Sequence, residues 1–282
     1  MIAVGVGLAL VAAAIHGTWN AVVKVSGDPL VTFRRATLMS GVVATVALVP
    51  EILIFGRPSV RLAAIALCVL SSFLETAYLV LLSNAYRRGE LSAVYPIARG
   101  SAPLIAVVIG LVVLGEQLST AQLAGVGLLL VGILAVALSQ AGGRATLPAL
   151  MTGVAIASYT AVDRIGVRMT APWFYGWLLF TLMAIELPIA LAIAGRFRRS
   201  VLPDQLPSWS KSAVIGVGMW LGYFLVLWAL SLAPLAVVAP VRETAIVAIA
   251  AWGVWRLHER RGAALKLSGA AATLAGVALL AL

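Results

Sequence analysis

The sequence predicts an all-α integral membrane protein with ten transmembrane helices, arranged as two inverted five-helix repeats. Three observations lead to this fold class. First, 62% of the 282 residues are hydrophobic and only 11% are charged, whereas a soluble domain has roughly 25% charged residues. Second, the apolar residues fall into repeated runs of about 20, the length of helix that crosses a bilayer. Third, the two halves of the chain repeat a pattern of arginine, glutamate and glycine.

Ten apolar runs are separated by short connections, so no soluble domain fits between them. Only residues 195–211, GRFRRSVLPDQLPSWSK, form a connection long enough to be a real loop, and their proline, aspartate and serine content agrees with that. The expected spans are Ile2–Val23, Val31–Phe55, Leu62–Asn84, Leu91–Leu114, Ala121–Leu138, Leu147–Val167, Trp173–Ala194, Ser212–Leu230, Leu235–Trp255 and Ala263–Leu282.

The fourth and fifth spans recur as the ninth and tenth. Arg242 lies 143 positions after Arg99, and Glu259 lies 143 positions after Glu116. Glycines seven positions apart mark both the fifth and the tenth span and predict close helix packing: Gly125 with Gly132, and Gly269 with Gly276.

Two repeats of five spans follow, residues 1–140 and residues 147–282. Because five is odd, the second repeat enters the membrane from the opposite side. Inverted repeats are the construction of many secondary transporters, whose substrate site lies near the midplane where the repeats meet.

The positive charges give an independent indication of the inversion. If the ten spans are right, 14 of the 20 lysines and arginines fall on one side of the membrane and four on the other, with two arginines inside spans. The richer side is cytoplasmic by the positive-inside rule, which predicts both termini outside. These loop cations contact lipid headgroups, so the net charge of +10 does not indicate nucleic acid as a partner. The four on the poorer side are Arg57, Arg61, Arg164 and Arg168.

No motif for catalysis, a metal or a cofactor is present. Cys68 is the only cysteine, which excludes an intrachain disulfide and a cysteine-based metal cluster. His16 and His258 lie on different expected helices, and neither HExxH, GxSxG nor a phosphate-binding glycine loop occurs. We therefore expect neither an enzyme nor a resident cofactor, and any transport runs on gradients or exchange.

Five ionisable residues qualify by their position well away from the span ends, and each costs at least about 2.5 to 3.5 kcal/mol at a helix centre. Two guanidiniums that converge on one cavity repel unless an anion or carboxylates lie between them. We expect the two arginines to bind an anionic group of the substrate, and Glu75 and Glu243 to balance charge or couple protons. The structural alternative is that the charges pair only to hold helices together. The five are Glu75, Arg99, Glu186, Arg242 and Glu243.

Aromatic and polar residues at helical spacing accompany these charges. Tyr95 precedes Arg99 by four residues and shares a face of its helix. Tryptophans and tyrosines also form interfacial belts, which is the alternative role for such residues. Asp163 lies near a helix end beside Arg164, so we expect those two to form a surface pair. The further candidates for substrate binding are His16, Trp19, Asn20, Tyr78, Tyr159, Trp220 and Tyr223.

Prolines inside the fourth and ninth spans free backbone carbonyls and permit bending. Pro96, Pro103 and Pro240 are therefore candidate hinges for alternating access. Static kinks are the other interpretation of the same residues.

Several stretches resemble the EamA-domain branch of the drug/metabolite transporter superfamily. They are AAIHGTWNAVVK, YPIARGSAPLIAVVIGLVVLGEQLSTAQLAGVGLLLVGI, SYTAVDRIGVR and APVRETAIVAI, and the resemblance covers the whole chain as two tandem domains. It implies a ten-helix basket with a central cavity and cytoplasmic termini, opposite to the orientation that the charges predict. The second repeat departs from the family pattern, with Ala239 where Pro96 aligns and RLHER in place of Leu-Gly-Glu-Arg.

We therefore expect a secondary transporter, an exporter or exchanger of a small organic metabolite bearing an anionic group. It would work by alternating access in the inner (cytoplasmic) membrane, as a monomer or homodimer, with proton coupling possible through its carboxylates. The alternative within the same fold is a flippase for a lipid or lipid precursor.

Overall fold

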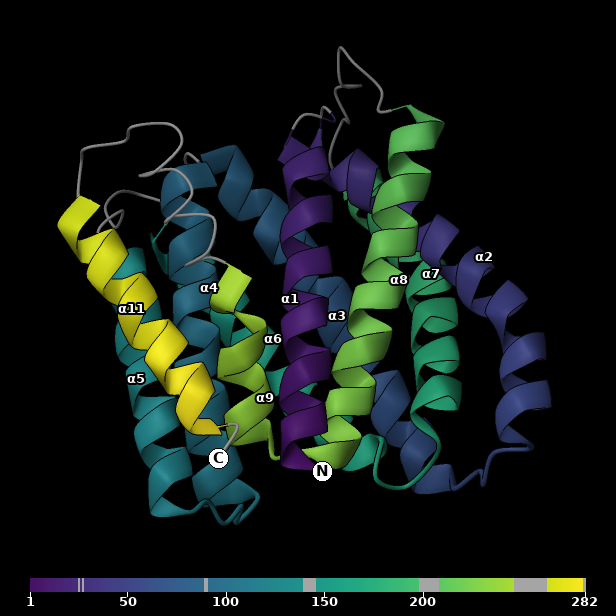
Figure 1. Cartoon of the computed structure of the whole chain (residues 1–282). Helices are drawn as coiled ribbons and strands as arrows, with labels where there is room; N and C mark the ends of the chain where they lie inside the picture. Colours follow the sequence, from purple (N-terminus) through teal and green to yellow (C-terminus); the bar gives the residue numbers. More distant parts are fainter. Residues whose placement is uncertain are drawn as a thin grey trace.

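The computed structural model describes residues 1–24, 26, 28–88, 91–138, 146–197, 208–245 and 263–280. Regular structure within these residues is helical throughout (Figure 1). The helices are α1 (Ile2–Lys24), α2 (Pro29–Phe55), α3 (Leu62–Arg88), α4 (Leu91–Val108), the π-helix η1 (Ile109–Val113), α5 (Thr120–Leu138), α6 (Thr146–Gly166), α7 (Pro172–Phe197), α8 (Trp209–Leu232), α9 (Leu235–Arg242) and α11 (Ala263–Leu280).

The structure confirms the helical character of the expected spans, with two differences in the described residues. The fourth span does not remain α-helical to Leu114, because residues Ile109–Val113 widen into a π-helix. The ninth begins at Leu235 as expected, but α9 ends at Arg242; the part of the expected span beyond residue 245 lies outside the described residues.

Side-chain caps explain why two helices begin earlier than their apolar runs. Asp28 accepts hydrogen bonds from the amides of Leu30 (2.9 Å) and Val31 (3.1 Å), and Pro29 occupies the first turn of α2. Ser208 caps α8 through the amide of Lys211 at 3.2 Å. The polar capping residues start both helices before the apolar runs do, which hydropathy alone does not show.

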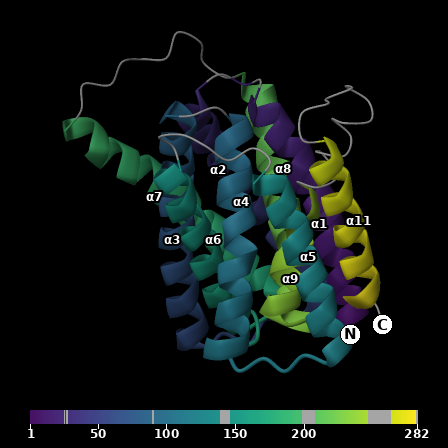
Figure 2. The same ribbon diagram turned by 90° about the vertical axis from the view of Figure 1, so that its left-hand side faces the viewer.

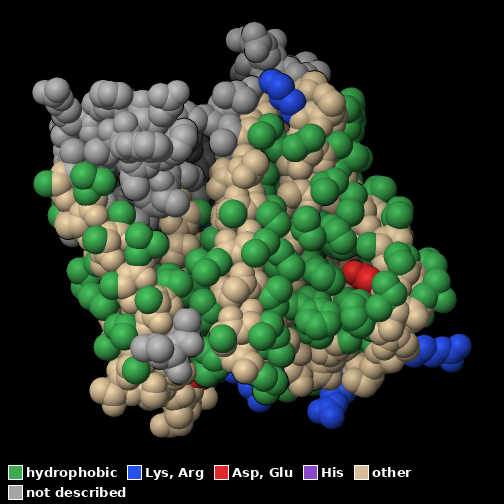
Figure 3. Space-filling model, viewed as in Figure 1, with side chains coloured by type: hydrophobic (Ala, Val, Ile, Leu, Met, Phe, Trp, Pro, Cys, Tyr) green, Lys and Arg blue, Asp and Glu red, His purple; other side chains and the backbone are tan. Residues whose placement is uncertain are grey.

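The outer surface suits a lipid environment. Five helices are long and apolar enough to cross a membrane, and three shorter apolar helices accompany them within the described residues. Large apolar side chains such as Val46, Leu53 and Leu274 are at least 70% exposed. Hydrophobic side chains cover the visible waist of the molecule, whereas Lys and Arg gather at its two ends (Figure 3). The chain is a multi-pass membrane protein.

Neighbouring helices come mostly from opposite halves of the chain. α1 packs on α8, α3 on α6, α2 on α7 and α8, α4 on α9, and α5 on α11. The pair α5 and α11 lies at one side of the bundle and α2 with α7 and α8 at the other, with α1, α6 and α9 between them (Figures 1 and 2).

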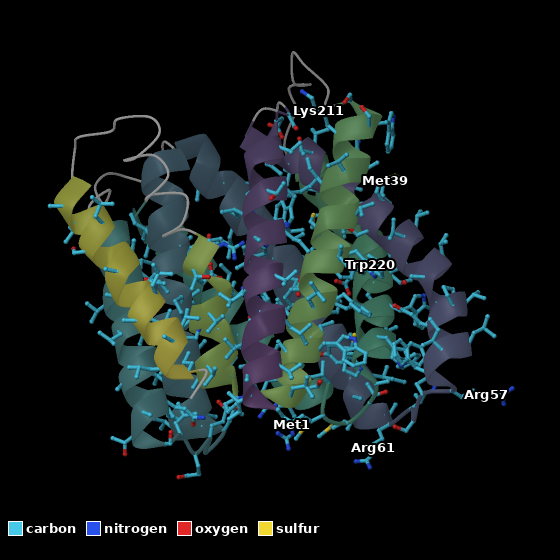
Figure 4. All side chains as sticks on the ribbon, in the orientation of Figure 1. Met1, Met39, Arg57, Arg61, Lys211 and Trp220 are labelled. Atoms are coloured by element: carbon cyan, nitrogen blue, oxygen red, sulfur yellow. The ribbon has the colours of Figure 1, made fainter. Side chains whose placement is uncertain are left out.

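α1 and α6 run in opposite directions through the bundle. Met1, at the start of α1, lies at the same end as Arg57 and Arg61, and Lys211 lies at the opposite end (Figure 4). Thr170, just after α6, donates a hydrogen bond to the carbonyl of Ser59 at 2.7 Å. α6 therefore ends at the face where α1 begins.

Glycines bring α5 and α11 into close contact, as their seven-residue spacing predicted. A Cβ atom built on Gly125 would lie 2.9 Å from the carbonyl oxygen of Gly276, and one on Gly276 would lie 2.6 Å from that of Gly125. Only residues without a side chain permit this approach.

Candidate functional site

A cavity lies among α1, α3, α6, α7, α8 and α9. α3 and α9 contribute Glu75 and Arg242 to its wall, and α1, α6, α7 and α8 contribute aromatic residues. Apolar residues such as Met183 and Phe180 complete it. The lining residues that the sequence had singled out are His16, Trp19, Glu75, Tyr78, Tyr159, Tyr223 and Arg242.

Arg99 lies behind this wall and is 1% exposed. Its Nη1 donates to Oε1 and Oε2 of Glu243 at 3.0 and 3.3 Å, and its Nη2 donates to the hydroxyl of Tyr78 at 3.2 Å. Nη2 also contacts Nε2 of His16. A guanidinium only donates hydrogen bonds, so this ring nitrogen accepts and His16 is neutral.

Arg242, at the end of α9, faces the cavity. Its Nε donates to Oε1 of Glu243 at 3.2 Å, and its Nη2 donates to the hydroxyl of Tyr159 at 3.3 Å. Its guanidinium carbon lies 5.9 and 5.8 Å from the ring centroids of Tyr159 and Tyr223. The remaining nitrogen, Nη1, is buried and has no hydrogen-bond partner among the described residues.

Glu243 is the carboxylate between the two arginines. Its Oε1 accepts from both guanidiniums, and its side chain is 3% exposed. α9 ends at Arg242, and the amide of Glu243 closes its last turn on the carbonyl of Pro240 at 3.1 Å. The helix end thus places two consecutive charged side chains in one buried cluster.

A second group of carboxylates lies at the junction of α3 and α6. Glu75 is 6% exposed, lines the cavity, and leaves its Oε1 without a hydrogen bond to any described residue. Asp163 is fully buried and accepts hydrogen bonds from the hydroxyls of Tyr175 (2.9 Å) and Tyr223.

The expectation that Asp163 and Arg164 form a surface pair is wrong. Arg164 turns the other way, where its Nε donates to Oε1 of Glu116 at 3.0 Å and its Nη1 donates to the carbonyl of Leu230. Helical geometry separates the two, because consecutive residues point about 100° apart around the axis.

Three tyrosines connect these charged groups across the cavity. The ring centroids of Tyr78 and Tyr159 are 5.7 Å apart, and those of Tyr159 and Tyr223 are 5.9 Å apart. The rings come from α3, α6 and α8, and their hydroxyls contact Arg99, Arg242 and Asp163 respectively. The tyrosines thus serve as hydrogen-bond partners of buried charges and not as interfacial belts.

The other expected residues lie apart from the described wall of the cavity. Asn20 donates to the carbonyl of His16 at 2.8 Å, and the Trp220 ring packs on Phe224 at 5.4 Å. Glu186 accepts from Ser72 at 2.7 Å and ties α7 to α3.

The candidate hinges lie in the two helices that carry the arginines. Pro103 is buried in α4 and Pro240 is buried in α9. Tyr95 and Pro96 belong to the first part of α4, but their side chains lie outside the described residues.

Glu116, which the repeat pattern singled out, stabilises the start of another helix. Its Oε1 accepts from the amide of Leu235 at 2.7 Å, and its Oε2 accepts from that of Ala236 at 2.9 Å, in addition to the bond from Arg164. These amides form the first turn of α9, so the carboxylate caps the helix that carries Arg242.

Comparison with known proteins identifies the first half of the chain. Residues 3–138 match the EamA-like transporter family. No curated protein matches the sequence significantly. One crystal structure of a protein superposes with a TM-score of 0.69 at 17% identity, covering 99% of this chain and 95% of that chain. At this identity the likeness shows the fold alone.

Proposed function

We propose that the chain, whose residues 3–138 match the EamA-like transporter family, is a secondary active transporter. It exports or exchanges a small organic metabolite with an anionic group, by alternating access around the central cavity. The transporter lies in the inner (cytoplasmic) membrane of the cell. The observation that carries the proposal is the unpartnered Nη1 of Arg242 in the wall of that cavity.

Arg242 is suited to hold the anionic group. Its Nε and Nη2 are fixed by Glu243 and Tyr159, which orients the planar guanidinium before a ligand arrives. A free N–H on a charged, buried guanidinium forms a strong hydrogen bond to a carboxylate or phosphonate. Arg99 supports this arrangement from behind, because it shares Glu243 with Arg242.

The carboxylates balance the arginines while the cavity is empty. Glu243 accepts from both guanidiniums and offsets their repulsion. When a substrate anion binds, the total negative charge of the cavity rises. Uptake of a proton by Glu75 or Glu243 would compensate, which couples transport to protons.

Packing between the halves supports an inverted-repeat mechanism with repeats at residues 1–140 and 147–282. If each helix is replaced by its counterpart in the other half, the pair α1 and α8 becomes the pair α6 and α3. Both pairs are in contact. The same exchange turns α4 with α9, and α5 with α11, into themselves. Pro103 and Pro240 act as hinges in the helices next to the cavity.

A solute carrier fits this cavity better than a lipid flippase does. Its wall contains Arg242, Glu75 and several tyrosine hydroxyls, which suit a compact polar solute.

Counterflow in proteoliposomes tests the proposed function. Vesicles with the purified protein are loaded in turn with amino acids, carboxylates, phosphonates and polyamines, and uptake of the labelled compound is measured. We expect at least one compound with an acidic group to exchange, and Arg242→Gln to abolish the exchange. The matched control Arg168→Gln, at an exposed position, retains it. Exchange that survives Arg242→Gln would contradict the site, and no exchange with any acidic compound would contradict the substrate class.

A further inference from the structure

A row of aromatic rings lies away from the central cavity, where α2, α7 and α8 meet. Six rings follow one another, and the centroid of each is 5.5 to 6.5 Å from that of the next. These residues do not belong to the described wall of the central cavity. In the order of their contacts they are Trp177, Phe174 and Trp173 of α7, Phe55 of α2, and Trp228 and Phe224 of α8.

The rings gather at the end of the bundle where Met1 lies. Phe55 is the last residue of α2, Trp173 lies in the first turn of α7, and Trp228 lies one turn before the end of α8. Arg57, two residues after α2, lies at the same end as Met1 (Figure 4). Aromatic residues at this depth are typical of an interfacial belt, so the rings alone do not indicate a ligand.

Glu51 is the feature that an aromatic belt does not explain. It lies four residues before Phe55 and therefore on the same face of α2. Its side chain is 8% exposed, whereas its neighbours Val49 and Leu53 are 62% and 80% exposed. Within the described residues Glu51 makes neither a hydrogen bond nor an ion pair. An ionisable residue inside a membrane span is costly, which makes it a candidate for function.

Helix register places Glu51 at the level of the rings. Two contacts define how α2 lies against α7: a Cβ built on Gly41 would be 2.7 Å from the Cβ of Ala184, and Phe55 stacks on Trp173. Residue numbers rise along α2 while they fall along α7, so the two helices are antiparallel. Glu51 lies between these contacts, one turn from the ring of Phe55.

An unpaired carboxylate next to aromatic faces is the chemistry that recognises an organic ammonium group. The carboxylate supplies the opposite charge, and the ring faces attract a cation through their quadrupole. Enclosed polar atoms without a partner occur on six described residues, and Glu51 is not among them, so its carboxylate is open to a ligand. A metal ion requires several ligands, and the described residues contain no group of three or more His, Cys, Asp or Glu that could hold one.

We propose that the ends of α2, α7 and α8 form a second binding site, separate from the central cavity, for an organic ammonium group. Glu51 pairs with the charge, and Phe55, Trp173 and Trp228 pack around its carbon substituents. Phe55 is 49% exposed on the outer surface, so the group enters from the membrane. The headgroup of phosphatidylethanolamine and a soluble amine share this chemistry. The site does not depend on the proposed transport function.

Binding of matched compounds to the purified full-length protein in phosphatidylglycerol nanodiscs tests the site. The probes are 2-phenylethylamine and 2-phenylethanol, which differ in the ammonium group. We expect the amine to bind at least about tenfold more tightly than the alcohol. Glu51→Gln should remove this preference, because it removes the charge at nearly equal volume. The control Glu186→Gln, at an intramembrane carboxylate that accepts from Ser72, retains it.

The contribution of the rings is measured in the same assay. Trp228→Leu should weaken binding of the amine about fivefold, because it removes an aromatic face. Trp228→Phe should restore most of the affinity, which a role in packing volume alone does not predict.

Native mass spectrometry identifies the source of the ammonium group. The protein is offered equal amounts of phosphatidylethanolamine and phosphatidylglycerol with the same acyl chains. A preference for phosphatidylethanolamine that Glu51→Gln removes supports the site with a lipid as its ligand. A preference for 2-phenylethylamine alone supports it with a soluble amine.

Equal binding of the amine and the alcohol, together with no preference between the two lipids, would overturn the inference. A preference that survives Glu51→Gln would overturn it as well. So would one that disappears in Glu75→Gln instead, because the ammonium group would then lie in the central cavity. Counterflow that depends on Arg242 is measured separately, so failure of this site and failure of the proposed function are distinguishable.

Discussion

Glu243 organises the charged cluster because one carboxylate oxygen serves two arginines. Arg99 Nη1 and Arg242 Nε lie 3.0 and 3.2 Å from the same Oε1, and all three side chains are at most 4% exposed. Removal of one partner from a buried ion pair leaves a charge that nothing compensates. The arginines therefore depend on Glu243 far more than they depend on Glu75.

Stability measurements can separate the two glutamates. Glu243→Gln should lower the free energy of unfolding by about 3 to 5 kcal/mol, because two buried guanidiniums lose their shared counter-charge. Glu75→Gln should cost less, because Glu75 Oε1 makes no hydrogen bond within the described structure. Thermal unfolding in detergent, monitored by intrinsic fluorescence, ranks the variants. A Glu75→Gln protein that unfolds at a lower temperature than Glu243→Gln would contradict this assignment.

The site could be predicted from the sequence where a residue's own context is unusual. Arg99, Arg242 and Glu243 stand out as charges inside apolar runs, and the structure places them in one cluster. Asp163 could not be found in this way, because its partners Tyr175 and Tyr223 come from other helices. Near a helix end, a charged residue gives no local sign of whether it is buried.

At the level of elements, α9 is held at both ends by charged groups. Two amides of its first turn donate hydrogen bonds to the carboxylate of Glu116, and its last turn carries Arg242 with Glu243 following it. Gly110 makes room for this contact, since a Cβ built there would lie 2.6 Å from Glu116 Oε2. The Leu-Gly-Glu sequence after the fourth span therefore positions an arginine more than a hundred residues away.

Removal of this cap should loosen α9. Glu116→Gln replaces charge-assisted hydrogen bonds, each of which contributes about 1.5 to 3 kcal/mol. We expect a lower melting temperature and faster amide hydrogen exchange at Leu235 and Ala236. Gln117→Ala, at the neighbouring exposed position, is the control. Unchanged exchange at both amides in Glu116→Gln would show that the carboxylate does not hold the helix.

The contact of α5 with α11 gives a second prediction at this level. Gly276→Ala places a methyl group 2.6 Å from the carbonyl oxygen of Gly125, which forces the helices apart. Overpacking of this kind costs about 1 to 3 kcal/mol. Gly127→Ala meets no atom within 4 Å and should leave the melting temperature unchanged. Equal stability of the two variants would contradict close packing at this crossing.

Helix boundaries at this scale were predictable only in part. Apolar length located the spans, but Asp28 and Ser208 begin helices through polar side chains. The π-helix Ile109–Val113 has an ordinary apolar composition, so nothing in its residues distinguishes it from α-helix.

For the whole molecule, lysine and arginine side chains mark both ends of the bundle. Arg57 and Arg61 lie at the same end of the bundle as Met1, and Lys211 lies at the opposite end (Figure 4). The recurrence of Arg99 and Glu116 after 143 positions made the two-fold organisation of the sequence visible. The cavity was less predictable, because its wall draws on six helices whose mutual rotation depends on packing.

Single-cysteine labelling measures the orientation that these charges predict. Cys68 is buried, and Cys68→Ser keeps a donor toward the carbonyl of Tyr175. In that background, Arg61→Cys should react with a membrane-impermeant thiol reagent on intact cells, whereas Lys211→Cys should react only after lysis. The physical reason is the excess of positive charge on the cytoplasmic side. The reverse pattern would refute the orientation, and reaction of both on intact cells would refute the span count.

The central claim is that the cavity between the halves binds the substrate through Arg242. The most direct measurement is the affinity of Arg242→Lys for the amino acid, carboxylate or phosphonate that the parent protein binds most tightly. Lysine keeps the charge beside Glu243 but lacks the planar set of N–H donors. We predict at least a tenfold loss of affinity, with Arg168→Lys unchanged. An Arg242→Lys protein that binds as tightly as the parent would contradict the claim.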